Sequence, residues 1–234
     1  MRRSSRASVL AASGLLALLP LMLTGCVGGS GRPEPTEVVT QYLSAIAEGD
    51  ASTATALDAA AVAAQHEGST TEEVGDFETL RTDAVLQGAE SRIDSVTVEP
   101  RAAAVGGDDD VRRVLFTYEL DGEETSSSLQ VKWDESSSTW ELEQSLTLSM
   151  SIDAVQSKVS LEPAPFRIGG VDETMAADAQ QAPLLYLVYP GVYRITSDIP
   201  KELLVPGTDT VQTVVAAMPG DVFVQFDVTE LPSS

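Results

Sequence analysis

The chain of 234 residues carries 36 acidic but only 14 basic side chains, a formal charge of −22 at neutral pH. This excess of acid argues against nucleic acid as a partner, because a chain with no basic stripe cannot neutralise phosphates. A single cysteine excludes an internal disulfide, so ordinary hydrophobic cores must stabilise the fold. The length suffices for one large or two small domains.

Residues 1–25 have the composition of a secretory signal peptide. Three arginines, Arg2, Arg3 and Arg6, precede the apolar run VLAASGLLALLPLML. The run is shorter than the about 20 residues that a membrane-spanning helix needs. A basic start, an apolar centre and small residues after it are typical of an exported protein.

The tetrapeptide Leu23-Thr24-Gly25-Cys26 follows the apolar run and resembles the bacterial lipobox. The resemblance implies diacylglycerol on the Cys26 sulfur, cleavage before Cys26, and acylation of the new amino group by a chain such as palmitate. Cys26 is also compatible with a free thiol, an intermolecular disulfide or an incidental residue after an ordinary cleavage site. Lipidation is favoured, because nothing in residues 27–31 can bury the thiol.

A lipid on Cys26 predicts localisation at the extracytoplasmic face of the cell membrane, with residues 26–35 as the tether. Loss of residues 1–25 removes three of the 14 basic side chains and no acid. The mature chain then has 11 basic and 36 acidic side chains, a formal charge of −25. This charge disfavours a flat contact with anionic lipid, and its main expected consequence is solubility.

Two helices are predicted over residues 36–64. Thr36 is placed to cap the first helix and Gly49 to end it, and Asp50 is placed to cap an alanine-rich second helix. A third helix is expected after Asp76. The apolar stripe of the first helix consists of Val38, Val39, Tyr42, Leu43 and Ile46.

From Ile93 onward the hydrophobic period changes from helical to two. Strands are predicted in RIDSVTVEP, RVLFTYEL and SLQVKW, and the clearest alternation runs from Trp140 to Asp153. One face of these strands is apolar and the other polar, which indicates an antiparallel sheet covered on one side. Helices followed by such a sheet predict an α+β fold.

The segments VVTQYLSAIAEGDASTATAL and VLFTYELDG…LQVKW…TWELEQSL resemble the nuclear-transport-factor-two-like, or cystatin-like, family. The resemblance implies helices packed on a curved antiparallel sheet, a cone, over residues 36–153. Enzymes of the family hold an acid–base pair in the cone. The apolar face of this sheet offers neither histidine nor acid, so the resemblance implies no catalytic residue here.

Gln144 interrupts the apolar row of the last predicted strand and, with Trp133 and Tyr118, is the candidate lining of a pocket. A buried amide needs hydrogen-bond partners or water. A ligand contact at the cone mouth is one interpretation of Gln144. A bulge, an edge position or a hydrogen bond to a helix end is the other, and it is favoured because cone-shaped sheets bend through bulges.

Residues 159–234 contain eight of the twelve prolines and are predicted to form a small β domain. The order FRIGGV, PLLYLVYPGVYRITS and DVFVQFDVTEL resembles β-sandwich modules of bacterial surface proteins, including PEGA-type domains. The resemblance implies a stalk or interaction module after a boundary between residues 153 and 159. Tyr186, Tyr189 and Tyr193 are either an exposed contact surface or, as favoured, part of the core.

The sequence offers no catalytic motif. It has no serine elbow, P-loop or Cys–His pair, and the only histidine, His66, lies in a polar gap without a second ligand. Asp108 to Asp110 lack the alternating spacing of calcium loops. No cofactor or metal is expected.

The predicted function is therefore that of a non-catalytic, lipid-anchored binding or protein-interaction protein at the cell envelope. Its expected partners are the membrane, through the anchor, and another envelope protein or a cell-wall fragment. Two alternatives stay open, a hydrolase or isomerase acting in the cone pocket and a purely structural envelope spacer.

Overall fold

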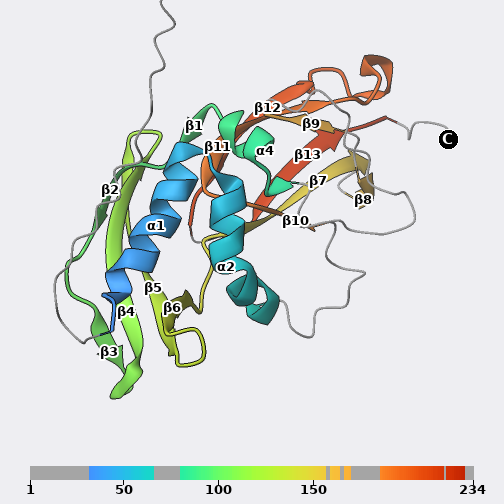
Figure 1. Ribbon diagram of the computed structural model, residues 1–234. Helices are drawn as coiled ribbons and strands as arrows, with labels where there is room; N and C mark the ends of the chain where they lie inside the picture. Colours follow the sequence, from blue (N-terminus) through green and yellow to red (C-terminus); the bar gives the residue numbers. More distant parts are fainter. Residues whose placement is uncertain are drawn as a thin grey trace, which may run out of the picture. The chain divides into compact units, whose positions relative to one another are not determined.

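The computed structural model describes residues 32–65, 80–156, 159–163, 166–169, 185–218 and 220–229. The described residues, from Arg32 onward, belong to one compact unit (Figure 1). The helices are α1 (Pro35–Glu48), α2 (Ala51–Gln65), α4 (Asp83–Gln87) and the 3-10 turn η1 (Lys201–Leu203). The strands are β1 (Ser91–Arg92), β2 (Asp94–Val98), β3 (Ala103–Val105), β4 (Asp108–Leu120), β5 (Glu123–Asp134), β6 (Thr139–Leu142), β7 (Leu148–Gln156), β8 (Val159–Pro163), β9 (Phe166–Ile168), β10 (Leu185–Val188), β11 (Gly191–Ser197), β12 (Val211–Ala216) and β13 (Val222–Asp227).

The first two helices follow the predicted pattern, with one difference at the start. α1 ends at Gly49, whose backbone is left-handed with φ of 82°, as its position predicted. The N-cap is Glu34 rather than Thr36, because Pro35 already occupies the first turn. Asp50 caps α2 as predicted, since its carboxylate accepts a hydrogen bond of 2.9 Å from the Thr53 amide. Asp76, the predicted start of a further helix, lies outside the described residues.

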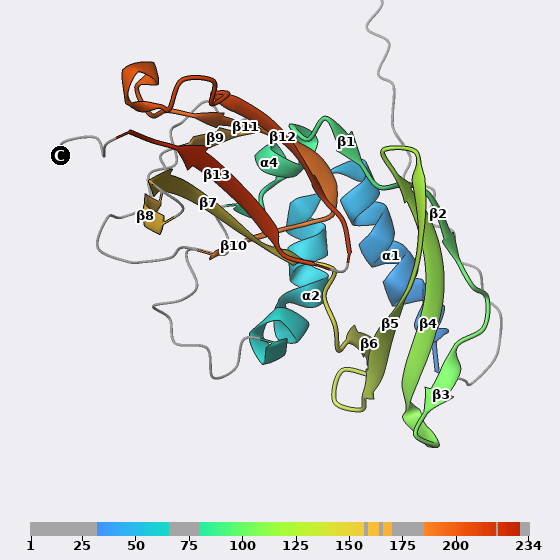
Figure 2. The same cartoon turned by 180° about the vertical axis from the view of Figure 1, so that it is seen from behind.

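The first sheet has the order β2-β4-β5-β6, with β3 also paired to β4, and all of these pairs are antiparallel. Asp121 and Gly122, both with positive φ, form the two-residue turn of the β4–β5 hairpin. Figures 1 and 2 show α1 and α2 beside this sheet, and both helices share a core with its apolar face. The core side chains on β4 and β5 are Val114, Phe116, Tyr118, Leu120, Leu129 and Val131.

The alternating run from Trp140 to Asp153 belongs to two strands rather than one. It forms β6 up to Leu142 and then leaves the first sheet through residues 143–147, which are in neither strand. β7, the second half, pairs in parallel with β13 and antiparallel with β10 and β8. The chain therefore changes sheets in the middle of its most regular period-two segment.

Two further sheets contain the C-terminal strands. One has the order β1-β11-β12, with β9 also on β11, and the other has the order β10-β7-β13, with β8 also on β7. Tyr189 and Pro190 join β10 to β11, and the chain passes there from one of these sheets to the other. Their inner side chains form a second core, which includes Phe166, Ile195 and Phe226.

The predicted fold class, an α+β cone of helices on one curved sheet followed by a small all-β sandwich-like domain, is wrong. The described residues form thirteen strands in three sheets and only three α-helices, so the fold is mainly β. The physical reason is the change of sheet at residues 143–147, because half of the predicted last cone strand pairs with C-terminal strands instead. The predicted boundary between residues 153 and 159 stays a prediction.

Candidate functional site

A buried acidic side chain, Asp58, is the first candidate for chemistry. It lies on the inward face of α2, where the other buried residues are Ala51, Ala54, Ala61 and Val62, and it is completely buried. Its Oδ1 accepts a hydrogen bond of 2.5 Å from Nη2 of Arg81, and the two side chains form an ion pair. Its Oδ2 accepts hydrogen bonds from the hydroxyls of Tyr42, at 2.9 Å, and Ser145, at 2.7 Å.

Tyr189 also contacts these side chains. We call the five residues together the Asp58 cluster: Asp58, Arg81, Tyr42, Ser145 and Tyr189. The Tyr189 hydroxyl lies 3.3 Å from Oδ2 of Asp58 and accepts a 3.1 Å hydrogen bond from Nη2 of Arg81. The cluster thus joins α1, α2, the bend between β6 and β7, and the turn after β10. Residues far apart in the sequence meet in it, and its two tyrosines both belong to the first core.

The surroundings of the Asp58 cluster shift the pKa values of its acids. Burial is the largest influence and raises the pKa of Asp58, against hydrogen bonds from Ser145, Tyr42 and Tyr189 and the charge of Arg81. Burial likewise raises the pKa of Tyr189 to about 12 and that of Tyr42 well above 10. Both carboxylate oxygens of Asp58 already accept hydrogen bonds, and the side chain reaches no solvent. The cluster is built to hold elements together rather than to meet a substrate.

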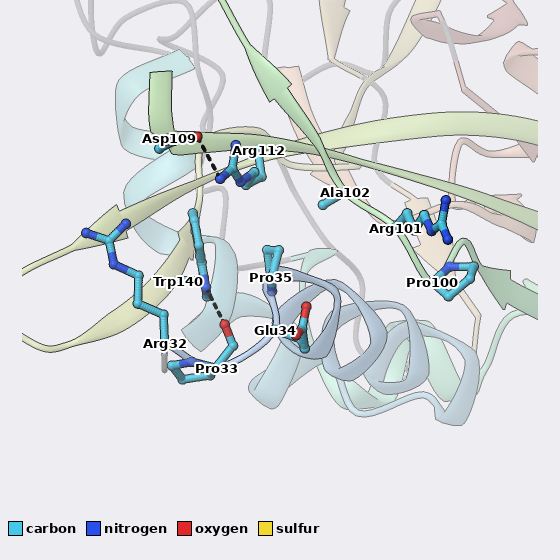
Figure 3. Close-up of a pocket in the computed structure, with 10 residues that line it drawn as sticks. All are labelled: Arg32, Pro33, Glu34, Pro35, Pro100, Arg101, Ala102, Asp109, Arg112 and Trp140. Atoms are coloured by element: carbon cyan, nitrogen blue, oxygen red, sulfur yellow. Dashed lines mark hydrogen bonds and ion pairs between the residues drawn. The ribbon is translucent and has the colours of Figure 1, made fainter. Parts of the chain in front are cut away.

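The second candidate is a cavity of about 600 Å³ at the start of the described chain, named the arginine cavity (Figure 3). The segment leading into α1, the connection from β2 to β3, the start of β4, and β6 all contribute to its lining. The lining residues are Arg32, Pro33, Glu34, Pro35, Pro100, Arg101, Ala102, Asp109, Arg112 and Trp140. A smaller cavity of about 340 Å³ shares Pro33, Glu34 and Trp140 with it.

The N-terminal wall of the arginine cavity is fixed by contacts to the first sheet. The indole N–H of Trp140 donates a hydrogen bond of 2.8 Å to the carbonyl oxygen of Pro33. The Arg32 guanidinium lies 4.8 Å from the ring centroid of Trp133 and forms an ion pair with Asp110. The ring of Trp133 in turn meets that of Trp140 edge to face, with centroids 5.5 Å apart. The last residues of the predicted tether are therefore docked on β5 and β6.

The remaining arginines of the cavity differ in how they are paired. Nη2 of Arg112 lies 3.0 Å from Oδ1 of Asp109 in an ion pair. The Arg112 side chain is only 23% exposed, whereas that of Asp109 is 87% exposed. Arg101 makes no ion pair or hydrogen bond with any residue that the structure describes. In Figure 3, Arg32 and Arg101 lie at opposite ends of the lining, with Arg112 between them.

The three side chains predicted to line a pocket lie outside the linings of the two cavities described above. Tyr118 is completely buried in the core, and burial raises its pKa. Trp133 is half-buried against Trp140. Gln144 lies in the bend after β6, where its Oε1 accepts a hydrogen bond of 3.2 Å from the Gln130 amide. None of the three lines the arginine cavity or the smaller one beside it.

Several predicted features fall outside the described residues. Leu23, Thr24, Gly25 and Cys26, and with them the lipidation site, precede the described range, and His66 lies in the gap after α2. Within the described residues, no helix has the length and apolar character needed to cross a membrane. In the same part of the chain, no three His, Cys, Asp or Glu side chains gather as ligands for a metal ion.

Comparison with known proteins adds little to this geometry. No protein-family model matches the chain. No curated protein matches it either. Among solved structures, a streptococcal ancillary pilin is similar at 12% sequence identity and a TM-score of 0.30, over 50% of this chain and 45% of the pilin chain. The chain thus spans less than half the length of that pilin.

Proposed function

We propose that this protein is a lipid-anchored, extracytoplasmic binding protein at the cell envelope, without turnover of its own. The observation that carries the proposal is the arginine cavity. Its volume of about 600 Å³ lies in the range of small-molecule sites, about 300–1,000 Å³. Three of the 11 basic side chains of the predicted mature chain line it, although the formal charge of that whole chain is −25. Such a local reversal of charge supports a binding role.

The lining supports binding rather than catalysis. Its two acids are Glu34 and Asp109, and Asp109 is already paired with Arg112. General acid–base work needs a titrating group within hydrogen-bond reach of the substrate. Asp58, the best-buried carboxylate of the described residues, does not line this cavity and is enclosed by its partners. A hydrolase or isomerase acting there would have to rely on Glu34 alone, because Asp109 is paired with Arg112 and Asp58 lies outside the lining.

The anchoring part of the proposal predicts the behaviour of Cys26→Ala. The wild type should incorporate a labelled fatty acid and partition into the detergent phase, because acyl chains contribute about 0.8 kcal/mol per buried methylene. The variant should remain unlabelled and in the aqueous phase. Phase partitioning and labelling in an exporting bacterial host measure both properties.

Ser30→Ala, a substitution after the lipobox, is the matched control and should leave the label unchanged. An unlabelled wild-type protein would overturn the anchoring proposal. Gentle cross-linking on intact cells then tests the binding role. A reproducible envelope partner or wall fragment supports it, and conversion of a substrate by the purified protein would contradict it.

A further inference from the structure

We propose that the arginine cavity binds a small molecule through an oxyanionic group, a carboxylate or a phosphate, held by Arg112, with Arg101 as a second positive charge at one end of the lining. The inference rests on the proposed binding function and names the chemical class of its ligand. Guanidinium groups present planar N–H donors that match the oxygens of both anions. Arg101 has no partner among the described residues, so its charge is not neutralised there and adds to the positive potential along the lining.

The ion pair between Arg112 and Asp109 is weak enough for a ligand anion to replace Asp109. Asp109 is 87% exposed, and an exposed ion pair is worth only about 0–1 kcal/mol. Arg112 itself is only 23% exposed, so the cavity walls shield its charge from water. Water therefore screens the attraction between Arg112 and an anion inside the cavity less than it screens the attraction between Arg112 and the exposed Asp109. The ligand anion can therefore replace Asp109 as the partner of Arg112.

The rest of the lining limits what else the ligand carries. Pro33, Pro35, Pro100, Ala102 and Trp140 provide apolar surface, which suits a ring or a short hydrocarbon part. Glu34 lies in the same wall without an ion pair among the described residues, so it would repel a ligand that is anionic throughout. A hydroxyl or amino group on the ligand can donate a hydrogen bond to the Glu34 carboxylate. The expected ligand is thus a polar small molecule with one anionic end.

The two tryptophans of the chain make the site easy to observe. Trp140 lines the cavity and Trp133 contacts Trp140, and the sequence contains no other tryptophan. The mature lipidated protein in neutral detergent micelles is titrated with glycerol 1-phosphate, inorganic phosphate and glucuronate, and with uncharged glucose as a control. The charged probes should change the tryptophan fluorescence in a saturable way, and glucose should not.

Two variants on β4 distinguish binding at a specific site from non-specific electrostatic attraction to the protein. Arg112→Gln should weaken binding of the charged probes at least about tenfold, the usual value of a hydrogen bond to a charged group. Arg113→Gln removes the same charge one residue further along, from an exposed position outside the cavity, and should leave the affinity unchanged. Equal losses in both variants, or no saturable response to any charged probe, would overturn the inference.

Vesicles distinguish the source of the anion. The lipidated protein is reconstituted in phosphatidylcholine vesicles with and without phosphatidylglycerol. A fluorescence change that appears with phosphatidylglycerol, and that Arg112→Gln removes, assigns the cavity to a lipid headgroup. A change with free glycerol 1-phosphate alone assigns it to a soluble ligand, and both results support an oxyanion site. If anchoring and cross-linking succeed while every titration fails, the binding role stands and the ligand class is wrong.

Discussion

Replacing Asp58 by asparagine is expected to lower the free energy of unfolding by about 3–5 kcal/mol, the usual cost of removing one partner of a buried ion pair. The guanidinium of Arg81 would stay buried without a counter-charge. The new amide would also place donor hydrogens among the hydroxyls of Tyr42, Ser145 and Tyr189, which now donate to the carboxylate. Urea unfolding at neutral pH, followed by tryptophan fluorescence, measures the change.

Two controls show whether the ion pair causes the loss. Ala59→Asn places the same residue at the next, exposed position of α2 and should cost no more than about 1 kcal/mol. The double variant Asp58→Asn with Arg81→Gln removes both charges and should recover about 1 kcal/mol or more relative to Asp58→Asn alone. A cost for Asp58→Asn that matches Ala59→Asn would contradict the assignment of the Asp58 cluster as a structural junction.

The elements of the N-terminal half could be predicted because their signals are local. The stripe through Val39, Tyr42 and Ile46 has the period of a helix, and Gly49 and Asp50 mark the end of α1 and the start of α2. The period of two likewise located β4 and β5, whose inward residues are those that alternate in the sequence. Each of these features depends on residues close together in the sequence, so it could be predicted without knowledge of tertiary contacts.

The arrangement of the sheets could not be predicted in the same way. Alternation tells which face of a strand is buried, but it does not tell which strand lies beside it. From Trp140 to Asp153 the pattern continues almost without interruption, although the chain moves from the partner β5 to the partners β10 and β13. The irregularity that marked the bend was Gln144, for which a structural role was favoured. Its Oε1 accepts a hydrogen bond from the amide of Gln130 in β5, a partner that no local pattern indicates.

The candidate sites were missed for a related reason. The arginine cavity is assembled from four separate segments, and no motif in any of them marks it. The Asp58 cluster left one local signal, an acid on the apolar face of an alanine-rich helix. That signal shows that Asp58 must have partners. Its partners Arg81 and Tyr189 are 23 and 131 residues away, and hydrophobic periodicity within one element cannot identify such distant partners.

Replacing Gly169 by alanine is expected to cost about 2–4 kcal/mol, because two penalties act at the same position. Gly169 follows β9 with a positive φ of 57°, a conformation that disfavours any Cβ. A Cβ there would also lie 3.0 Å from the carbonyl oxygen of Val85 and 3.2 Å from the carbonyl carbon of Gly88. Both neighbours are backbone atoms, in α4 and directly after it, so no side chain can move aside. Thermal and urea unfolding of the variant measure the loss.

Gly107→Ala is the matched control for Gly169→Ala. Gly107 also has a positive φ, of 81°, in the turn between β3 and β4, but apart from its chain neighbours no atom lies within 4 Å of the position that a Cβ would take. Only the conformational penalty applies there, so the expected cost is about 1–2 kcal/mol. The difference between the two variants measures how closely the end of β9 approaches α4. Equal costs would mean that this approach is looser than the backbone distances indicate, and that α4 can move away from the second core without loss.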